Sequence, residues 1–141
     1  MKYIDHIPDM MLDENRMKQV FMNLILNSMQ AMPDGGAITI SCKYSERSVC
    51  IEVSDSGTGM SQDVLDHAFE PFFSAKSGGT GMGLSNVKRI IDQHGGSIQI
   101  ESEENKGTKV TIIMETLRER MRDEVISYFI LHPFLNSSID I

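Results

Sequence analysis

Residues 14–53 read ENRMKQVFMNLILNSMQAMPDGGAITISCKYSERSVCIEV. The spacing of their apolar residues changes once, and this change decides the fold. Over 14–32, apolar residues recur every three or four positions, which predicts a helix with one buried face. The turn PDGG at 33–36 ends that helix, because proline cannot continue it and glycine tolerates a positive φ. Apolar and polar residues then alternate over 38–42 and 49–53, which predicts an antiparallel hairpin.

The rest of the chain repeats these two patterns. Two more helices and three more strands are predicted: helices over 61–69 and 84–94, strands over 97–101 and 109–114, and an edge strand in the opening residues through Leu12. Asp13 is a suitable N-cap for the first helix, and Gly95-Gly96 ends the last one. The order predicts an α+β fold, a two-layer α/β sandwich whose mixed, mostly antiparallel sheet is covered on one face by helices.

The length of 141 residues and a hydrophobic content of 40% suit one domain with a real core. We place that domain at 1–115. A helical spacing of apolar residues resumes at Leu117, Met121 and Val125, so we expect 116–141 to be a helical tail or linker of unknown role.

Composition excludes some classes of function. A net charge of −7 argues against general binding of nucleic acid. No apolar run approaches the roughly 20 residues of a membrane span, and no signal peptide is visible, so we expect a cytoplasmic chain without membrane contact. Alternation places Cys42 and Cys50 on opposite faces of the hairpin, which predicts free thiols.

Two asparagines lie one helical turn apart in the first helix. Asn23 and Asn27 project side by side, and amide oxygens suit Mg²⁺, which takes few protein ligands when it also binds phosphate. Asparagine is also a mediocre residue for a helix interior. The pair could instead face solvent or bond a neighbouring loop.

Two glycine-containing motifs follow. Asp55 to Gly59, DSGTG, comes directly after a strand, and a carboxylate there could accept a hydrogen bond from an exocyclic amine such as that of adenine. The loop 78–84, GGTGMGL, leads into a helix, and its free backbone amides could cradle phosphates. It lacks the lysine and hydroxyl residue of a Walker-type loop. A simple turn and a flexible linker are the alternatives for these motifs.

Phe69 to Phe73 is rich in phenylalanine and is followed by Lys76 at the entry to the glycine loop. Phe69 and Phe72 fit a core role. Lys76 could place a positive charge on a terminal phosphate, or it could be an ordinary solvated lysine.

The order and spacing of these motifs resemble one family, the histidine-kinase branch of the ATP-binding (GHKL) fold shared with type II topoisomerases, a mismatch-repair ATPase and a heat-shock chaperone. Five segments carry the resemblance: Asn23 to Asn27 as the asparagine box, Asp55 to Gly59 as the first glycine box, Phe69 to Phe73 as the phenylalanine box, Gly79 to Leu84 as the second glycine box, and Lys106-Gly107-Thr108 as the closing Gly-Thr.

The resemblance implies ATP and Mg²⁺ as ligands. Asn27 is the implied main metal ligand with Asn23 assisting, Asp55 reads the adenine amine, and Thr108 supports that contact. The implied catalytic residues are Asn23, Asn27 and Lys76. The implied nucleotide-binding residues are Asn23, Asn27, Asp55, Gly57, Gly59, Lys76, Thr80, Gly81, Met82, Gly83, Leu84 and Thr108.

The family also implies a reaction. Hydrolysing members carry a glutamate where this chain has Asn23, and an amide cannot act as a general base at neutral pH. We therefore expect a protein-histidine kinase domain of two-component signalling, which donates the γ-phosphate to a histidine on a separate dimerisation domain, with a response regulator downstream. None of the four histidines lies in the surroundings expected of that acceptor. The alternative is a nucleotide-dependent module of the same fold, such as an anti-sigma-like serine kinase or an ATPase clamp.

Overall fold

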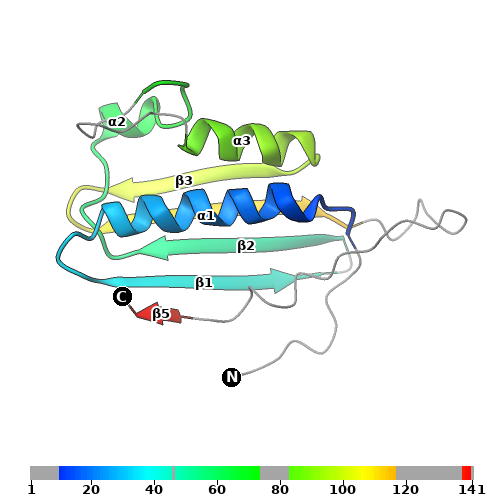
Figure 1. The fold of residues 1–141 in the computed structure, drawn as a ribbon, viewed down its shortest axis with the longest axis horizontal. Helices are drawn as coiled ribbons and strands as arrows, with labels where there is room; N and C mark the ends of the chain where they lie inside the picture. The colour runs from blue at the N-terminus through cyan, green and yellow to red at the C-terminus, as the bar shows by residue number, and fades with distance from the viewer. Residues whose placement is uncertain (1–9, 46, 74–82, 117–137, 141) are drawn as a thin grey trace, which may run out of the picture.

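A computed structural model describes residues 10–45, 47–73, 83–116 and 138–140. Two long helices lie side by side over one face of an antiparallel sheet (Figure 1). The elements are, in chain order, α1 (Glu14–Gln30), β1 (Ala37–Tyr44), β2 (Ser48–Asp55), α2 (Gln62–Asp66), α3 (Gly83–Gln93), β3 (Ser97–Glu103), β4 (Gly107–Glu115) and β5 (Ser138–Asp140). The strand order is β3-β4-β2-β1-β5, and every described pair of strands is antiparallel. The predicted two-layer α+β sandwich is confirmed.

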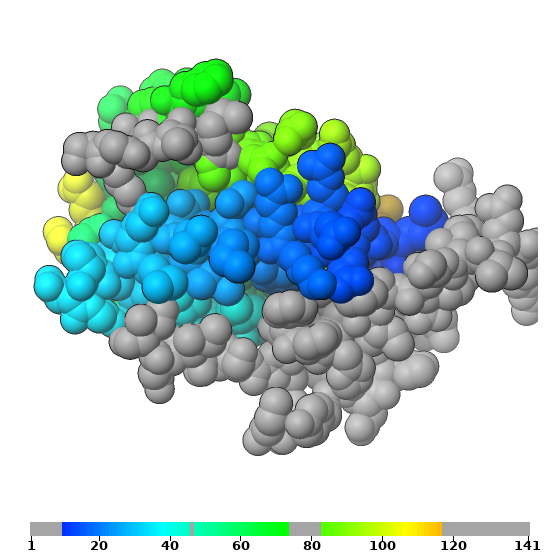
Figure 2. All heavy atoms as spheres, viewed as in Figure 1, coloured from blue at the N-terminus to red at the C-terminus, as the bar shows by residue number. Residues whose placement is uncertain are grey.

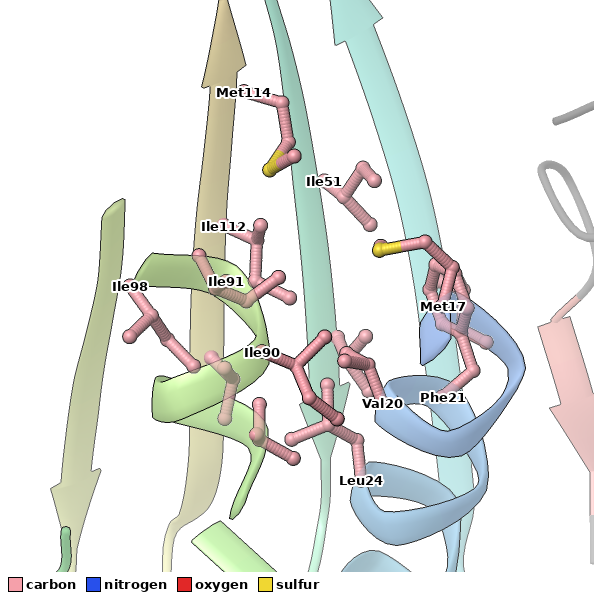
Figure 3. Close-up of a cluster of buried hydrophobic side chains, with 14 of the residues drawn as sticks. Met17, Val20, Phe21, Leu24, Ile51, Ile90, Ile91, Ile98, Ile112 and Met114 are labelled. Carbon is pink, nitrogen blue, oxygen red and sulfur yellow. The ribbon is translucent and has the colours of Figure 1, made fainter. Parts of the chain in front are cut away.

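The core lies between the helices and the covered face of the sheet. Alternation along the strands turns Ile51 and Ile112 toward the helices, and both are fully buried. Figure 3 shows Val20 and Leu24 of α1 meeting Ile90 of α3 beside these strands. Burial of this contiguous apolar cluster is the main favourable term in folding.

The helix ends follow the sequence signals. The Asp13 side chain accepts a hydrogen bond from the Arg16 amide at 3.0 Å, which confirms Asp13 as the N-cap of α1. Gly95 has a φ of +71°, the conformation that ends α3. Strands β3 and β4 run about two residues further toward their shared turn than alternation predicts, because backbone pairing continues into polar residues.

α1 and α3 are joined at one end by a histidine (Figure 2 shows the two helices side by side on one surface). His94 Nδ1 donates to the Ile90 carbonyl at 2.7 Å, and its Nε2 accepts from the Asp13 amide at 3.1 Å. The start of α1 is thereby attached to the end of α3.

The tail differs from its prediction where it is described. Residues 138–140 form β5 and pair with Ala37 to Thr39 of β1. The helical tract expected after Leu117 lies outside the described residues, as does most of the predicted opening strand, whose last residues, Met10 to Leu12, form no strand. Within the part of the chain that is described, no helix has the length and apolarity to cross a bilayer.

Candidate functional site

The predicted site residues gather at one end of the sandwich. The last residue of β2, the first residues of β4, the C-terminal half of α1 and the start of α3 meet there (Figure 1). This follows from the topology, because α1 and α3 run in opposite directions across the same sheet.

The Asp55 carboxylate accepts three hydrogen bonds at this end of the molecule. Its Oδ1 accepts from the Gly57 amide at 2.9 Å and from the Thr108 amide at 3.3 Å. Its Oδ2 accepts from the Ser28 hydroxyl at 2.9 Å. Three bonds from three different segments fix a half-buried carboxylate in one orientation.

Glycines bring the surrounding backbone close to this carboxylate. A Cβ at Gly57 would lie 2.7 Å from the Ala31 carbonyl oxygen at the end of α1. Gly59 has a φ of +65°, and a Cβ there would collide with the Glu103 carbonyl. Only glycine fits both positions, so the motif after β2 is required for packing as well as for its turn.

A second hydrogen-bonded group supports Thr108. The Ser102 and Thr108 hydroxyls lie 2.9 Å apart, and Ser102 also accepts from the Met60 amide at 2.9 Å. The Asn105 amide donates to the Thr58 carbonyl at 2.7 Å. The turn after β2 and the turn between β3 and β4 therefore form one hydrogen-bonded unit.

The asparagine pair lies on the side of α1 that approaches α3. Asn27 is half-buried, and a Cβ at Gly83 would lie 3.4 Å from its Nδ2 and 3.5 Å from its Oδ1. Asn23 is half-buried one turn earlier. The amide of Asn27 thus borders the start of α3, whose first backbone amides have no partner within the helix and carry partial positive charge.

The structure brings together most of the predicted binding residues and leaves four undescribed. Asn23, Asn27, Asp55, Gly57, Gly59, Gly83, Leu84 and Thr108 lie at this end of the molecule. Lys76, Thr80, Gly81 and Met82 lie outside the described residues. No group of three or more His, Cys, Asp or Glu side chains in the described ranges could hold a metal ion, so a metal here would depend on neutral amide oxygens and on its other ligand.

Two residues of this site were missed by the sequence prediction. Ser28 is treated there only as a small residue on the buried face of the helix, and Ser102 as part of a polar turn. A serine on an otherwise apolar stripe is a usable signal, because a buried hydroxyl needs a partner.

The two described histidines have structural partners. His67 Nδ1 donates to the Asp63 carbonyl at 2.8 Å, and this bond, followed by the charge of Glu70, raises the pKa of His67. His94 joins α1 to α3 through both ring nitrogens.

A hollow of about 380 Å³ lies at the same strand ends but opens on the uncovered face of the sheet. Glu101 and Lys109, which form an ion pair, line it with Ser54. These side chains project away from the helices, since they alternate with the buried Val53 and Val110. Asp55 and Thr108 also line the hollow, so it reaches the strand ends that carry these two side chains.

Comparison with known proteins gives a consistent result. Residues 12–118 match the family described as histidine kinase-, DNA gyrase B-, and HSP90-like ATPase. The sensor histidine kinase ZraS of Escherichia coli (strain K12) is 44% identical over 108 residues, which are 77% of this chain and 23% of that protein. Sporulation kinase D of Bacillus subtilis (strain 168) is 46% identical over 101 residues, 72% of this chain and 20% of that protein. The chain spans about a quarter or less of the length of these curated relatives.

Solved structures show the same fold. The nucleotide-free catalytic domain of histidine kinase ThkA superposes with a TM-score of 0.67 at 35% identity, over 76% of this chain and 70% of that one. Full-length ShkA, solved in complex with AMPPNP, superposes with a TM-score of 0.64 at 28% identity, over 77% of this chain and 23% of that one.

Proposed function

The chain belongs to the family of histidine kinase-, DNA gyrase B- and HSP90-like ATPases, and from that premise we propose that it is the domain of a sensor histidine kinase that binds Mg-ATP and donates the γ-phosphate. The observation that carries the proposal is the Asp55 carboxylate, fixed by Ser28, Gly57 and Thr108 at the end of β2. A carboxylate held in this way is an acceptor for the exocyclic amine of adenine. The solved complex of the similar ShkA with AMPPNP supports a nucleotide at this fold.

Mg²⁺ would be held through amide oxygens. Asn27 is the proposed main ligand and Asn23 assists, because both lie half-buried on the side of α1 that faces the start of α3. Two neutral oxygens suit a Mg²⁺ ion that is also bound by phosphate and water. When bound, the ion would neutralise negative charge on the phosphates.

The phosphates would lie at the start of α3. This helix has 11 residues, and the amides of Gly83 and Leu84, which have no partner within the helix, offer donors and partial positive charge. Lys76, Thr80, Gly81 and Met82 are proposed to complete the phosphate site.

We expect transfer of the phosphate to a protein rather than to water. Asn23 stands where a hydrolysing relative would need a general base, and a carboxamide does not accept a proton at neutral pH. The chain then has to bind and orient ATP while a histidine from another domain attacks in line. That domain belongs to the same kinase in our proposal, and a response regulator accepts the phosphate next.

Calorimetric titration tests the ligand assignment. We expect Asn27→Ala to weaken ATP with Mg²⁺ far more than ADP in the presence of a metal chelator, because only the first ligand set includes the ion. Asp55→Asn should weaken both. The matched control is Asn15→Ala, which removes an exposed asparagine from the same helix. Equal losses for both ligands with Asn27→Ala would contradict the metal assignment.

A transfer assay tests the reaction. ATP labelled on its γ-phosphate is incubated with this chain and a histidine-bearing dimerisation domain from a similar kinase. We expect acid-labile label on that domain, and none when its acceptor histidine is changed to glutamine. Label released only as inorganic phosphate would instead favour the ATPase clamp.

A further inference from the structure

Ser28 is the only buried polar side chain among the described residues, with an exposed fraction of 5%. It lies on α1 directly after Asn27, on the stripe that otherwise buries Val20 and Leu24. Its hydroxyl donates to Asp55 Oδ2 at 2.9 Å across 27 residues of sequence. This hydrogen bond therefore links α1 to the end of β2 and occupies one acceptor position of the Asp55 carboxylate.

The two oxygens of Asp55 differ in how much acceptor capacity they retain. A carboxylate oxygen has about two lone-pair positions. Oδ1 uses both, one for the Gly57 amide and one for the Thr108 amide. Oδ2 uses one, for Ser28. One acceptor position is therefore left on the carboxylate, and it lies on Oδ2.

We propose that Ser28 is a positioning residue that leaves Asp55 with this single open acceptor, and so makes the site selective for purines that carry an amino group at carbon 6. The inference rests on the proposed binding of ATP. The 6-amino group supplies the one proton that Oδ2 lacks. A 6-oxo purine brings a second acceptor to the same place, with no proton between the two oxygens, and that arrangement is costly in a partly desolvated site.

Ser28 strengthens this selectivity because its own proton is already used. A serine free to rotate could donate to a 6-oxo group and rescue the wrong base. Here the hydroxyl would have to leave Asp55 Oδ2 to do so, which would leave that oxygen without a partner.

The test compares three nucleotides that differ at the N1–C6 edge of the purine: ATP with a 6-amine, purine riboside triphosphate with hydrogen at carbon 6, and inosine triphosphate with a 6-oxo group and a proton on N1. We expect Ser28→Ala to weaken ATP by roughly five- to ten-fold, which corresponds to the typical net contribution of one hydrogen bond. The hydrogen-bearing analogue should change by less than about two-fold, because it makes no contact that depends on Oδ2. The preference for ATP over inosine triphosphate should fall.

Ser28→Thr should restore both affinity and selectivity, because it keeps the hydroxyl. Ser41→Ala is the matched control: the Ser41 hydroxyl also donates to a carboxylate, Glu52 Oε2 at 3.1 Å, but on the uncovered face of the sheet. That variant should leave all three affinities unchanged. If Ser28→Ala does not fold, Ser28→Cys keeps the volume with a weaker donor and should show the same pattern.

Equal losses for ATP and the hydrogen-bearing analogue would overturn the inference, because they would make Ser28 a packing residue only. Unchanged ATP affinity in Ser28→Ala would do the same. Wild-type protein that binds none of the three nucleotides would instead reject the proposed function itself, so the two failures are distinguishable.

Discussion

The two faces of the sheet use the same strands and differ in what covers them. Ile112 faces the helices and is fully buried, whereas its neighbour Ile113 faces away and is 39% exposed. On the uncovered face, Lys43 and Lys109 pair with Glu52 and Glu101. Stability therefore depends on the covered face, and a polar group found there, such as Ser28, has a specific reason to be present.

The largest effect expected from this comparison is on the core. Ile112→Ala should lower the free energy of unfolding by about 2–5 kcal/mol, because it removes buried methyl groups and leaves a cavity. Ile113→Ala, one residue along the same strand, should cost less than about 1 kcal/mol. Urea denaturation measures both, and equal losses would mean that something also covers the second face.

A smaller effect is expected at the hydrogen bond from the Asp13 amide to His94, which joins α1 to α3. His94→Ala should cost about 0.5–1.5 kcal/mol, since it removes the hydrogen bond from the Asp13 amide, while the Ile90 carbonyl keeps its bond from the backbone amide of residue 94. His67→Ala is the control, because that ring also bonds a carbonyl but lies at the C-cap of the five-residue α2 and does not join α1 to α3. Hydrogen exchange of the Asp13 amide should accelerate only in the His94 variant. Unaltered hydrogen exchange of the Asp13 amide would argue against its hydrogen bond to His94.

A difference in reactivity without a large difference in stability is expected for the cysteines. Burial, and then the neighbouring Cys50, raise the pKa of the Cys42 thiol to about 11. Because only the thiolate reacts, a thiol with that pKa is about one part in a thousand reactive at pH 8. In a Cys50→Ser background burial still raises the pKa of Cys42, so its alkylation should accelerate about ten-fold per pH unit past pH ~9. A plateau before pH 9 would contradict this, and unfolding in urea should remove the difference.

The smallest effect is expected on the uncovered face. The ion pair between Lys109 and Glu101 raises the pKa of Lys109, chiefly through its hydrogen bond to Glu101. Both side chains are largely exposed, so Lys109→Met should leave the unfolding midpoint unchanged at physiological salt. A clear loss that persists in high salt would mean that this face is less solvated than the structure indicates.

Periodicity was sufficient to predict most of this fold. Helices over 14–32 and 84–94 and the hairpin around 38–53 appear within a few residues of their predicted limits, because each buries one regular stripe. The pairing of β5 with β1 had no signal, since three residues are too few to show alternation. Backbone pairing beyond the apolar residues of β3 and β4 also had no signal, because it continues into polar residues.

The site was predicted by residue type but not by its connections. Asp55 and the neighbouring glycines are typical of a simple turn, so they point to a site only together with the other motifs. The bonds from Ser28 and Thr108 to Asp55 join segments far apart in sequence, so no local pattern could reveal them. The sensor kinases among the relatives favour the histidine kinase over the clamp and the anti-sigma-like module.

The join between Asp13 and His94 has a mechanical consequence for the opposite end of the molecule. At a rise of 1.5 Å per residue, Asn27 lies roughly 20 Å along α1 from that join. The two helices are therefore held together at the end remote from the proposed nucleotide site. A tilt of about 5° at the join would shift Asn27 by about 2 Å relative to Gly83, enough to make or break a metal–oxygen bond.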